Sequence, residues 1–388
     1  MIDFGIDRLL KEGAVWKSQP IGMITNAAAT TNMRIPSRKA LIEAGFNIQQ
    51  LFSPEHGLDT HDADGAYVDD GIDELTNLPI TSLYGSKLTP TEEDLAKIDM
   101  ILFDIPDIGV RFYTYLWTLS YALEACAKWN KKLVVLDRPN PISGDLSLAE
   151  GPMLNDACAS FIGRWNIPVR HACTLGELAH YFKHRQKLDV DLLVIPCGGW
   201  DRNMLQPDWG HIFVPTSPAI QSFAAMQLYP GLCFLEATNL HEGRGTEFSF
   251  RSVAAPWLAT GTLSGLLQNM FEEELTIETI HFVSGNEKYE NQLCNGLRFM
   301  VKDSTSFKPV FFGLMLIKLI KDIHPNFFEW NDYKTNANPT GNRHLDKLTG
   351  IQNAEQLFNL SFPLFLANIT KEIYVPEWKN EISKFLFY

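Results

Sequence analysis

The sequence lacks the short motifs that mark several large classes of enzyme. No G-x-G-x-x-G turn follows its first predicted strand, where residues 26–31 read NAAATT, and no Walker A sequence is present. A G-x-S-x-G elbow is also missing, which disfavours a serine hydrolase. A nucleotide-dependent enzyme is therefore disfavoured, and no cofactor is expected.

Clustered cysteines and metal-ligating patterns are missing as well. The six cysteines are widely scattered, with no C-x-x-C, so neither a disulfide framework nor a zinc knuckle is expected. His180 and His184 have the spacing of a zincin helix, but Tyr181 stands where that motif needs Glu. We therefore interpret the two histidines as surface residues and expect no metal site.

Long apolar runs and positive charge are also scarce. No run approaches the roughly 20 apolar residues of a membrane span. With 33 Lys and Arg against 46 Asp and Glu, the net charge is −13, which disfavours nucleic acids and anionic membranes as partners. The first residues, MIDFGIDRLLKEG, show no signal peptide. We expect a soluble, cytoplasmic protein, or a periplasmic or secreted one if a leader was removed.

What the sequence does contain is an alternation typical of α/β proteins. Its 388 residues, 45% of them hydrophobic, allow a sizeable core and predict two domains. Short apolar runs alternate with helical stretches, which indicates βαβ units around a parallel sheet, and the alternation fades between residues 150 and 167. The predicted strands of the first half are residues 20–25, 48–52, 99–105 and 132–137, and the helices are 37–45, 92–97 and 115–128. In the second half we predict strands at 191–197 and 233–238, a strand pair within 280–303 and a helix over 309–325.

Ionisable or amide side chains follow each of the four strands predicted in the first half. In an open parallel sheet, ligands bind in the crevice beyond the carboxyl ends of the strands. Loops after strands are polar in any case, but four loops that carry such groups favour a site. The residues are Asn26, Glu55 with His56, Asp107 with Arg111, and Asp137 with Arg138 and Asn140.

A second polar cluster follows residues 233–238. Its glycines allow a backbone to approach a ligand closely, and its arginine offers a planar fork suited to a carboxylate or phosphate. A solvated loop is the alternative interpretation. The segment GVRFYTY similarly places a cation and aromatic rings after a strand, unless it only packs a helix N-terminus. The residues of the cluster are Glu236, Asn239, Glu242, Arg244 and Glu247, and those of the segment are Arg111, Tyr113 and Tyr115.

Carboxylates grouped with amides, arginines and aromatics, without a cofactor motif, point to hydrolysis of a glycosidic bond. One carboxyl group protonates the leaving oxygen, and a second carboxylate or a group within the sugar acts on the other face. Aromatic and amide side chains suit sugar rings and hydroxyl groups, and arginines suit an acidic sugar.

Longer strings then occur in a fixed order: LFSPEHG, FD-x-x-D-x-G-x-R-F-Y-T-Y, LDRPNP, EGP, RH-x-x-T-x-GELA, YPG, TNL-x-EGRGT and APW. In this order they resemble the bacterial NamZ-type exo-β-N-acetylmuramidases, a glycoside hydrolase family. The resemblance runs from about residue 5 to the C-terminus. It implies a Rossmann-like N-terminal domain, taken here as residues 1–155, and a smaller α/β domain over residues 156–388 that closes the cleft.

The resemblance also implies an activity and roles for residues. The family releases N-acetylmuramic acid from the non-reducing end of peptidoglycan fragments, in cell-wall recycling, without nucleotide or metal. The SPEHG motif places the catalytic acid at Glu55, which His56 could orient. For the second carboxylate, which the resemblance does not identify, our own candidates are Glu242 and Asp107. The lactyl carboxylate of the sugar would give an arginine a partner. The expected substrate-binding residues are Asn26, Arg111, Tyr113, Arg138, Asn140, Glu236, Asn239 and Arg244.

The sequence departs from the family pattern at four places. Asp59-Thr60 replace an Arg-Gly pair, Pro106 replaces Gln, Ala219 replaces Asn and Ala237 replaces Gly. These positions fall in the expected site loops. The alternative hypothesis is therefore a saccharide-binding protein that has kept the cleft and lost the chemistry.

Overall fold

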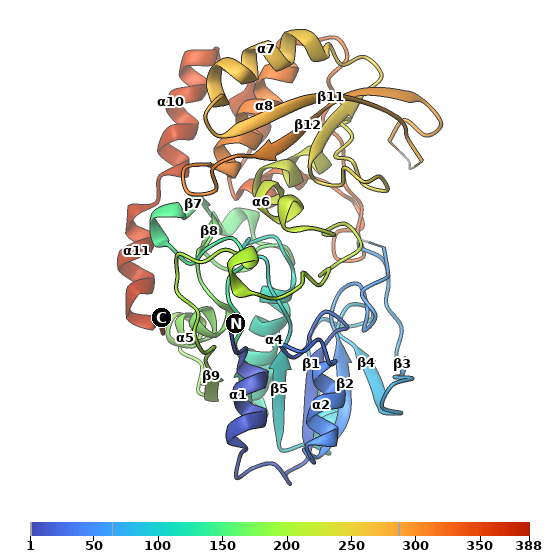
Figure 1. Ribbon diagram of the computed structural model, residues 1–388, viewed down its shortest axis with the longest axis vertical. Coiled ribbons are helices and arrows are strands. Elements are labelled where there is room, and N and C mark those ends of the chain that lie inside the picture. The colour runs from blue at the N-terminus through green and yellow to red at the C-terminus, as the bar shows by residue number, and fades with distance from the viewer. Residues whose placement is uncertain (1, 64, 286–287) are drawn as a thin grey trace.

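The computed structural model, which describes residues 2–63, 65–285 and 288–388, has two parts stacked along its long axis (Figure 1). The lower part is built on a seven-stranded sheet and the upper part on a three-stranded antiparallel sheet. Helices α10 and α11 run down one side and bring the C-terminus back beside α5 of the lower part. The protein is thus a mixed α/β structure with a larger and a smaller sheet.

The large sheet is parallel except for its edge strand β3, which is antiparallel to β4. The four strands predicted in the first half are confirmed as β1, β2, β5 and β6, and they are neighbours in this sheet. In spatial order the strands are β3 (Gly71–Ile72), β4 (Pro79–Ser82), β2 (Ile48–Ser53), β1 (Ile21–Thr25), β5 (Met100–Asp104), β6 (Lys132–Leu136) and β9 (Asp191–Ile195).

Helices cover both faces of the large sheet, because alternate residues of each strand point to opposite faces. On β5, Met100 and Leu102 join the core under α1 and α2, whereas Ile101 and Phe103 join the core under α4 and α5. Both faces are therefore buried, as the continuous apolar runs predict. The helices of this part are α1 (Gly5–Glu12), α2 (Ser37–Glu43), α3 (Glu92–Leu95), α4 (Tyr115–Lys128) and α5 (Leu175–Arg185).

The upper part packs helices against its antiparallel sheet, and the predicted strand pair is confirmed as β11 and β12. The predicted helix over 309–325 is confirmed as α8, which has Pro309 at its first position. The strands are β10 (Ser252–Ala255), β12 (Leu293–Val301) and β11 (Leu275–Val283). The helices are α6 (Phe223–Leu232), α7 (Thr260–Phe271), α8 (Pro309–Ile323), α9 (His344–Thr349), α10 (Phe362–Ile373) and α11 (Pro376–Ile382).

Two features differ from the sequence-based expectation. The predicted strand over 233–238 is wrong: Cys233–Ala237 form a 3₁₀ helix that continues directly from α6, and a short, fully buried run has no periodicity that separates strand from helix. A boundary after residue 155 would cut the large sheet, because β9 pairs with β6. The alternation fades at 150–167 because β7 (Glu150–Met153) and β8 (Pro168–Arg170), which form a small antiparallel sheet, are inserted before α5.

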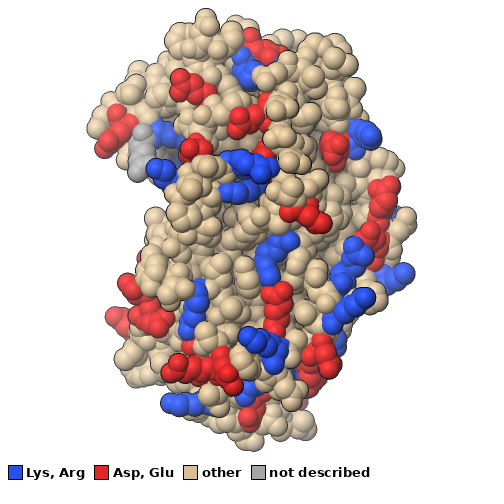
Figure 2. Space-filling model, turned by 180° about the vertical axis from the view of Figure 1, so that it is seen from behind, with Lys and Arg blue, Asp and Glu red and all other residues tan. Residues whose placement is uncertain are grey.

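No helix of the described residues is long and apolar enough to cross a membrane. Lys and Arg side chains lie among Asp and Glu side chains on the face shown in Figure 2, and the outline of the molecule is hollowed at one side between its two parts.

Candidate active site

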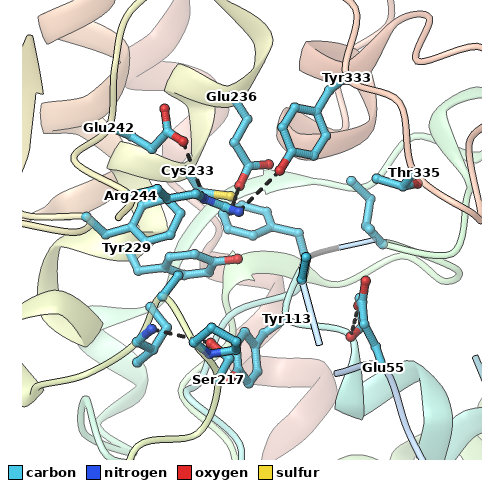
Figure 3. Close-up of a pocket in the computed structure, with 18 of the residues that line it drawn as sticks. Glu55, Tyr113, Ser217, Tyr229, Cys233, Glu236, Glu242, Arg244, Tyr333 and Thr335 are labelled. Carbon is cyan, nitrogen blue, oxygen red and sulfur yellow. Dashed lines mark hydrogen bonds and ion pairs between the residues drawn. The ribbon is translucent and has the colours of Figure 1, made fainter. Parts of the chain in front are cut away.

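A cavity of about 530 Å³ lies between the two parts of the molecule. The carboxyl end of β2 and the start of α4 form one side, and the segment after α6 forms the other. Glu55 stands on the first side, apart from Glu236, Glu242 and Arg244 on the second (Figure 3). The cavity therefore places carboxyl groups on two opposed walls.

Glu55 is held at the tip of β2 by two hydrogen bonds. Its Oε1 accepts from the backbone N–H of Gly65 at 3.0 Å, and its Oε2 accepts from the hydroxyl of Thr114 at 2.6 Å. Glu55 is only 5% exposed but lines the cavity. Thr114 directly precedes α4, so the two strand-end loops of β2 and β5 together fix this side chain.

His56 follows Glu55 in a tight turn, with φ of +68°. Its Nδ1 lies 2.9 Å from the carbonyl oxygen of Asp62. A carbonyl oxygen can only accept, so Nδ1 carries the proton and a neutral ring keeps Nε2 as an acceptor. His56 lines the cavity beside Glu55, where the resemblance places it.

Two buried tyrosines complete the wall that carries Glu55. Tyr113 donates to the Thr216 hydroxyl at 2.7 Å, and Tyr115 donates to the Thr216 carbonyl at 2.9 Å. Burial raises the pKa of both phenols well above the ordinary value, so both stay neutral. Their rings give this wall an apolar surface suited to a sugar ring.

The opposite wall is a network of ion pairs. Arg244 pairs with Glu236 and, through its Nε at 3.3 Å, with Glu242. Lys288 Nζ lies 3.0 Å from the other oxygen of Glu242. Burial alone would raise the pKa of Glu242, but Lys288 and Arg244 outweigh it and hold this pKa below its usual value. Glu242 is therefore ionised at neutral pH.

The loop before α9 and the start of that helix add two aromatic residues to the second wall. Arg244 Nη1 donates to the Tyr333 hydroxyl at 3.2 Å (Figure 3). His344 Nε2 lies 3.0 Å from Glu236 Oε2, and its ring stacks on Tyr333 at 4.6 Å between centroids. Neither residue belongs to any motif recognised in the sequence. They approach the cluster from about 100 residues away, and no local pattern signals them.

Six of the predicted site residues line the cavity: Glu55, His56, Tyr113, Glu236, Glu242 and Arg244. The other six predicted residues do not line this cavity, although Asn239 lines an adjoining hollow that also includes Glu236 and Lys288. The six are Asn26, Asp107, Arg111, Arg138, Asn140 and Asn239.

Arg111 and Arg138 show why a charged residue after a strand need not face a ligand. Arg111 is fully buried, and its guanidinium donates to the carbonyl oxygens of Pro152, Ile167 and Leu348. Arg138 forms a buried ion pair with Asp104 at 2.6 Å. Neither residue lines the cavity, so of the three predicted arginines, Arg244 alone lies on its wall.

The remaining four predicted residues stabilise turns and loops. Asp107 accepts from the N–H of Gly109 at 2.8 Å and faces His171 at 3.4 Å. Asn26, Asn140 and Asn239 each accept a backbone N–H, from Ala28, Ile142 and Glu329 respectively. These placements leave Glu242 as the candidate second carboxylate that lies in the cavity.

Three of the four departures from the family pattern do not line the cavity. Ala219 lines it, whereas Pro106 lines a separate cavity of about 60 Å³. Asp59 is exposed, and Ala237 is buried inside its 3₁₀ helix. One departure out of four therefore contacts the space where a substrate would bind. Among the described residues, no group of three His, Cys, Asp or Glu side chains is arranged to hold a metal ion.

Comparison with known proteins links this geometry to a family. Residues 21–224 match the family described as Exo-beta-N-acetylmuramidase NamZ, N-terminal, and residues 227–388 match its C-terminal counterpart. The two matches meet after β9, in agreement with the extent of the large sheet. A relative named Peptidoglycan beta-N-acetylmuramidase NamZ, from Bacillus subtilis (strain 168), is 37% identical over 331 residues, or 85% of this chain and 80% of the relative.

Two crystal structures of DUF1343 family proteins from Bacteroides fragilis share the fold. Each comparison covers 100% of this chain and 99% of the other chain. One has a TM-score of 0.88 at 27% identity, and the second a TM-score of 0.74 at 24% identity. The second bears on the fold alone.

Proposed function

The chain belongs to the NamZ family of exo-β-N-acetylmuramidases, and on this premise we propose that it is a glycosidase. It would release N-acetylmuramic acid from the non-reducing end of peptidoglycan fragments, as in cell-wall recycling. The proposed reaction is the same whether the protein meets these fragments in the cytoplasm or in the periplasm. The observation that carries it is the placement of the Glu55 carboxyl group on one wall of the cavity, opposite the ionised Glu242.

In this proposal Glu55 is the general acid. It gives its proton to the glycosidic oxygen as the bond between that oxygen and the anomeric carbon breaks, and the leaving sugar departs as an alcohol. Water supplies the hydroxyl group that the anomeric carbon gains in N-acetylmuramic acid, and the proton that this water loses restores the acid form of the enzyme. The bonds from Gly65 and Thr114 hold the carboxyl group in one orientation, which is what proton transfer to a fixed oxygen requires. His56, anchored through Nδ1, packs beside it.

Glu242 is our candidate for the second carboxylate. Its lowered pKa keeps it negative while positive charge develops on the sugar ring in the transition state. An ionised Glu242 cannot be the proton donor at neutral pH, so the two carboxyl groups have different roles. The 2-acetamido group of the substrate is the alternative for the same step.

Arg244 is our candidate for recognising the acidic substituent of the sugar. It projects from the second wall into the cavity, over the ring of Phe250 at 4.8 Å. Its guanidinium carries five N–H donors, so it would donate to a lactyl carboxylate as a further partner. Tyr113 and Tyr229 offer apolar ring faces in the same space.

The test is incubation of the protein with the disaccharide MurNAc-GlcNAc and detection of the products by mass spectrometry. The proposal predicts equimolar N-acetylmuramic acid and N-acetylglucosamine, and no cleavage of a GlcNAc-GlcNAc control that lacks the lactyl group. Thermal stabilisation by the disaccharide without cleavage would instead identify a saccharide-binding protein. Neither cleavage nor stabilisation would reject both hypotheses.

A further inference from the structure

A loop of the C-terminal part reaches the loop that holds the catalytic carboxyl group. We call residues 333–341 the strap. It is closed on itself, because the N–H of Tyr333 donates to the carbonyl of Gly341 at 3.0 Å, and Asn338 donates to the carbonyl of Thr335 at 3.1 Å. The strap is therefore a small preformed unit rather than an extended connection.

Asn336 at the tip of the strap makes two hydrogen bonds to the N-terminal part. Its backbone N–H donates to the carbonyl of Gly65 at 2.8 Å. Its side-chain amide donates to the carbonyl of Gly85 at 3.2 Å. One residue thus joins two separate loops of the N-terminal part.

Gly65 connects the strap directly to Glu55. The carbonyl oxygen of Gly65 accepts from the backbone N–H of Asn336, and the N–H of Gly65 donates to Glu55 Oε1. The fit is close: a Cβ added at Gly65 would lie 2.6 Å from the Cβ of Thr335, and its φ is +68°. Glycine is required here both by the backbone conformation and by the contact with the strap.

The other end of the strap connects to the opposite wall. Tyr333 accepts from Arg244 and stacks on His344, which in turn contacts Glu236. A single short loop therefore contacts the supports of Glu55 and the supports of Arg244. Thr335, in the middle of the strap, lines the cavity between them (Figure 3).

We propose that the strap sets the position of the general acid, with Asn336 as a positioning residue that acts on Glu55 through Gly65. The inference rests on the proposed function, because it assigns the strap to the alignment of Glu55 with the glycosidic oxygen. The side-chain amide of Asn336 anchors the tip of the strap to Gly85, so its loss would loosen the backbone hydrogen bond from Asn336 to Gly65 and, with it, the support that Gly65 gives to the Glu55 carboxyl group. Small displacements of a catalytic group lower the rate of the chemical step more than they lower substrate binding.

The competing explanation is that the strap only stabilises the fold. Ala337 packs against a small apolar cluster of Val68, Tyr84 and Phe161, so the strap also contributes packing. The two explanations differ in what a variant at Asn336 does to the folded enzyme. If the strap has a purely structural role, substitution of Asn336 lowers the stability of the fold, and the molecules that remain folded keep the normal kcat.

The experiment compares Asn336→Ala and Asn336→Asp with the wild type. The aspartate keeps the shape of the side chain but replaces the amide donor with an acceptor, so both variants lose the bond to Gly85. Thr340→Ala, at an exposed position of the same strap, is the matched control. The measurements are kcat and KM on MurNAc-GlcNAc for the folded fraction, and hydrogen exchange at the Gly65 amide.

We expect kcat to fall roughly tenfold to 100-fold in both Asn336 variants, with KM nearly unchanged. Exchange at the Gly65 amide should accelerate in the same variants, since its bond to Glu55 opens more often. Thr340→Ala should match the wild type in all three quantities. An unchanged kcat, or activity lost only in proportion to the unfolded fraction, would overturn the proposal.

The test of the strap can fail or succeed independently of the test of the proposed function. If the wild type does not cleave the disaccharide, the proposed function fails, and exchange at Gly65 alone then tests the strap. Unchanged exchange in Asn336→Ala would show that the strap does not hold the Gly65 peptide, whereas faster exchange would support the coupling between them.

Discussion

Two groups of charged side chains were predicted for the site, and the structure shows that they use their charges differently. Arg111 and Arg138 follow strands of the large sheet, yet both are buried and bound to carbonyl groups or to Asp104. Glu242 and Arg244 lie in a loop of the upper part and face the cavity. The difference shows that a position after a strand does not by itself make a residue functional. What decides is which groups its polar atoms bind and whether its side chain faces a cavity.

The comparison assigns the two groups different experimental signatures. Substitutions in the buried group should lower the stability of the fold and leave the kinetics of the folded enzyme nearly unchanged. Substitutions in the cavity group should lower the turnover of the molecules that remain folded, whatever they cost in stability. The predictions that follow test this division, from the largest expected effect to the smallest.

The first prediction concerns Arg111 in the buried group. Arg111→Met keeps the length of the side chain but removes the donor to the buried carbonyl groups of Pro152 and Leu348, whereas the carbonyl of Ile167 keeps a backbone N–H. We expect the free energy of unfolding to fall by at least about 2 kcal/mol, measured by urea denaturation, because each unsatisfied buried group costs about 1–3 kcal/mol. The KM of the folded variant should match the wild type. A raised KM at normal stability would instead make Arg111 a substrate-binding residue.

The second prediction compares the two candidates for the second carboxylate. Glu242→Gln removes a charge that faces the cavity, so kcat on MurNAc-GlcNAc should fall roughly 100-fold. Asp107→Asn should leave kcat nearly unchanged, because Asp107 faces Gly109 and His171 outside the cavity. Steady-state kinetics on both variants, with melting temperatures as a check on folding, distinguish the two. If neither variant loses activity, the acetamido group of the substrate takes the role of the second carboxylate.

The third prediction is a pH dependence of stability that arises outside the cavity. Glu150 on β7 accepts from the N–H groups of Val310 and Phe311 at the start of α8, and burial raises its pKa from 4.5 to about 7. The folded state therefore binds this proton more tightly than the unfolded state does. Stability from Glu150 is complete below pH 4.5 and is lost as the pH rises toward about 7, by at most about 1.4 kcal/mol per pH unit.

Glu150→Gln should remove this part of the slope, since Gln does not titrate. Thermal unfolding between pH 5 and 7 measures it, and burial also raises the pKa of Asp137 to about 7, which leaves a residual slope in the variant. An identical slope in wild type and variant would show that Glu150 titrates normally in the folded protein.

Much of the fold could be predicted from the sequence. The four parallel strands were recognisable because apolar runs of five or six residues end at Gly, Pro or polar residues, and the strand pair β11–β12 and helix α8 followed from similar signals. The sequence did not show how far the large sheet extends, because β9 joins the sheet only after an inserted pair of short strands. Sequence alternation reports local periodicity and does not report which strand pairs with which.

The site was predictable in part. Its motif residues Glu55, Glu236, Glu242 and Arg244 all line the cavity. Within GVRFYTY, the hypothesis chose Arg111 and Tyr113, of which Tyr113 alone lines the cavity, and it did not include Thr114, which holds Glu55. The direction of a side chain after a strand end depends on tertiary packing, and spacing alone does not give it. Tyr333, His344 and Lys288 come from segments without a motif and reach the site only through the packing of the upper part.

The most direct test of the account compares Glu55→Gln on two substrates, MurNAc-GlcNAc and 4-nitrophenyl β-N-acetylmuramide. A sugar alcohol needs a proton to leave, whereas 4-nitrophenolate leaves without one. If Glu55 is the general acid, Glu55→Gln should lose at least about 100-fold in kcat on the disaccharide and far less on the nitrophenyl substrate. Equal losses on both substrates, or full activity on the disaccharide, would contradict the role assigned to Glu55.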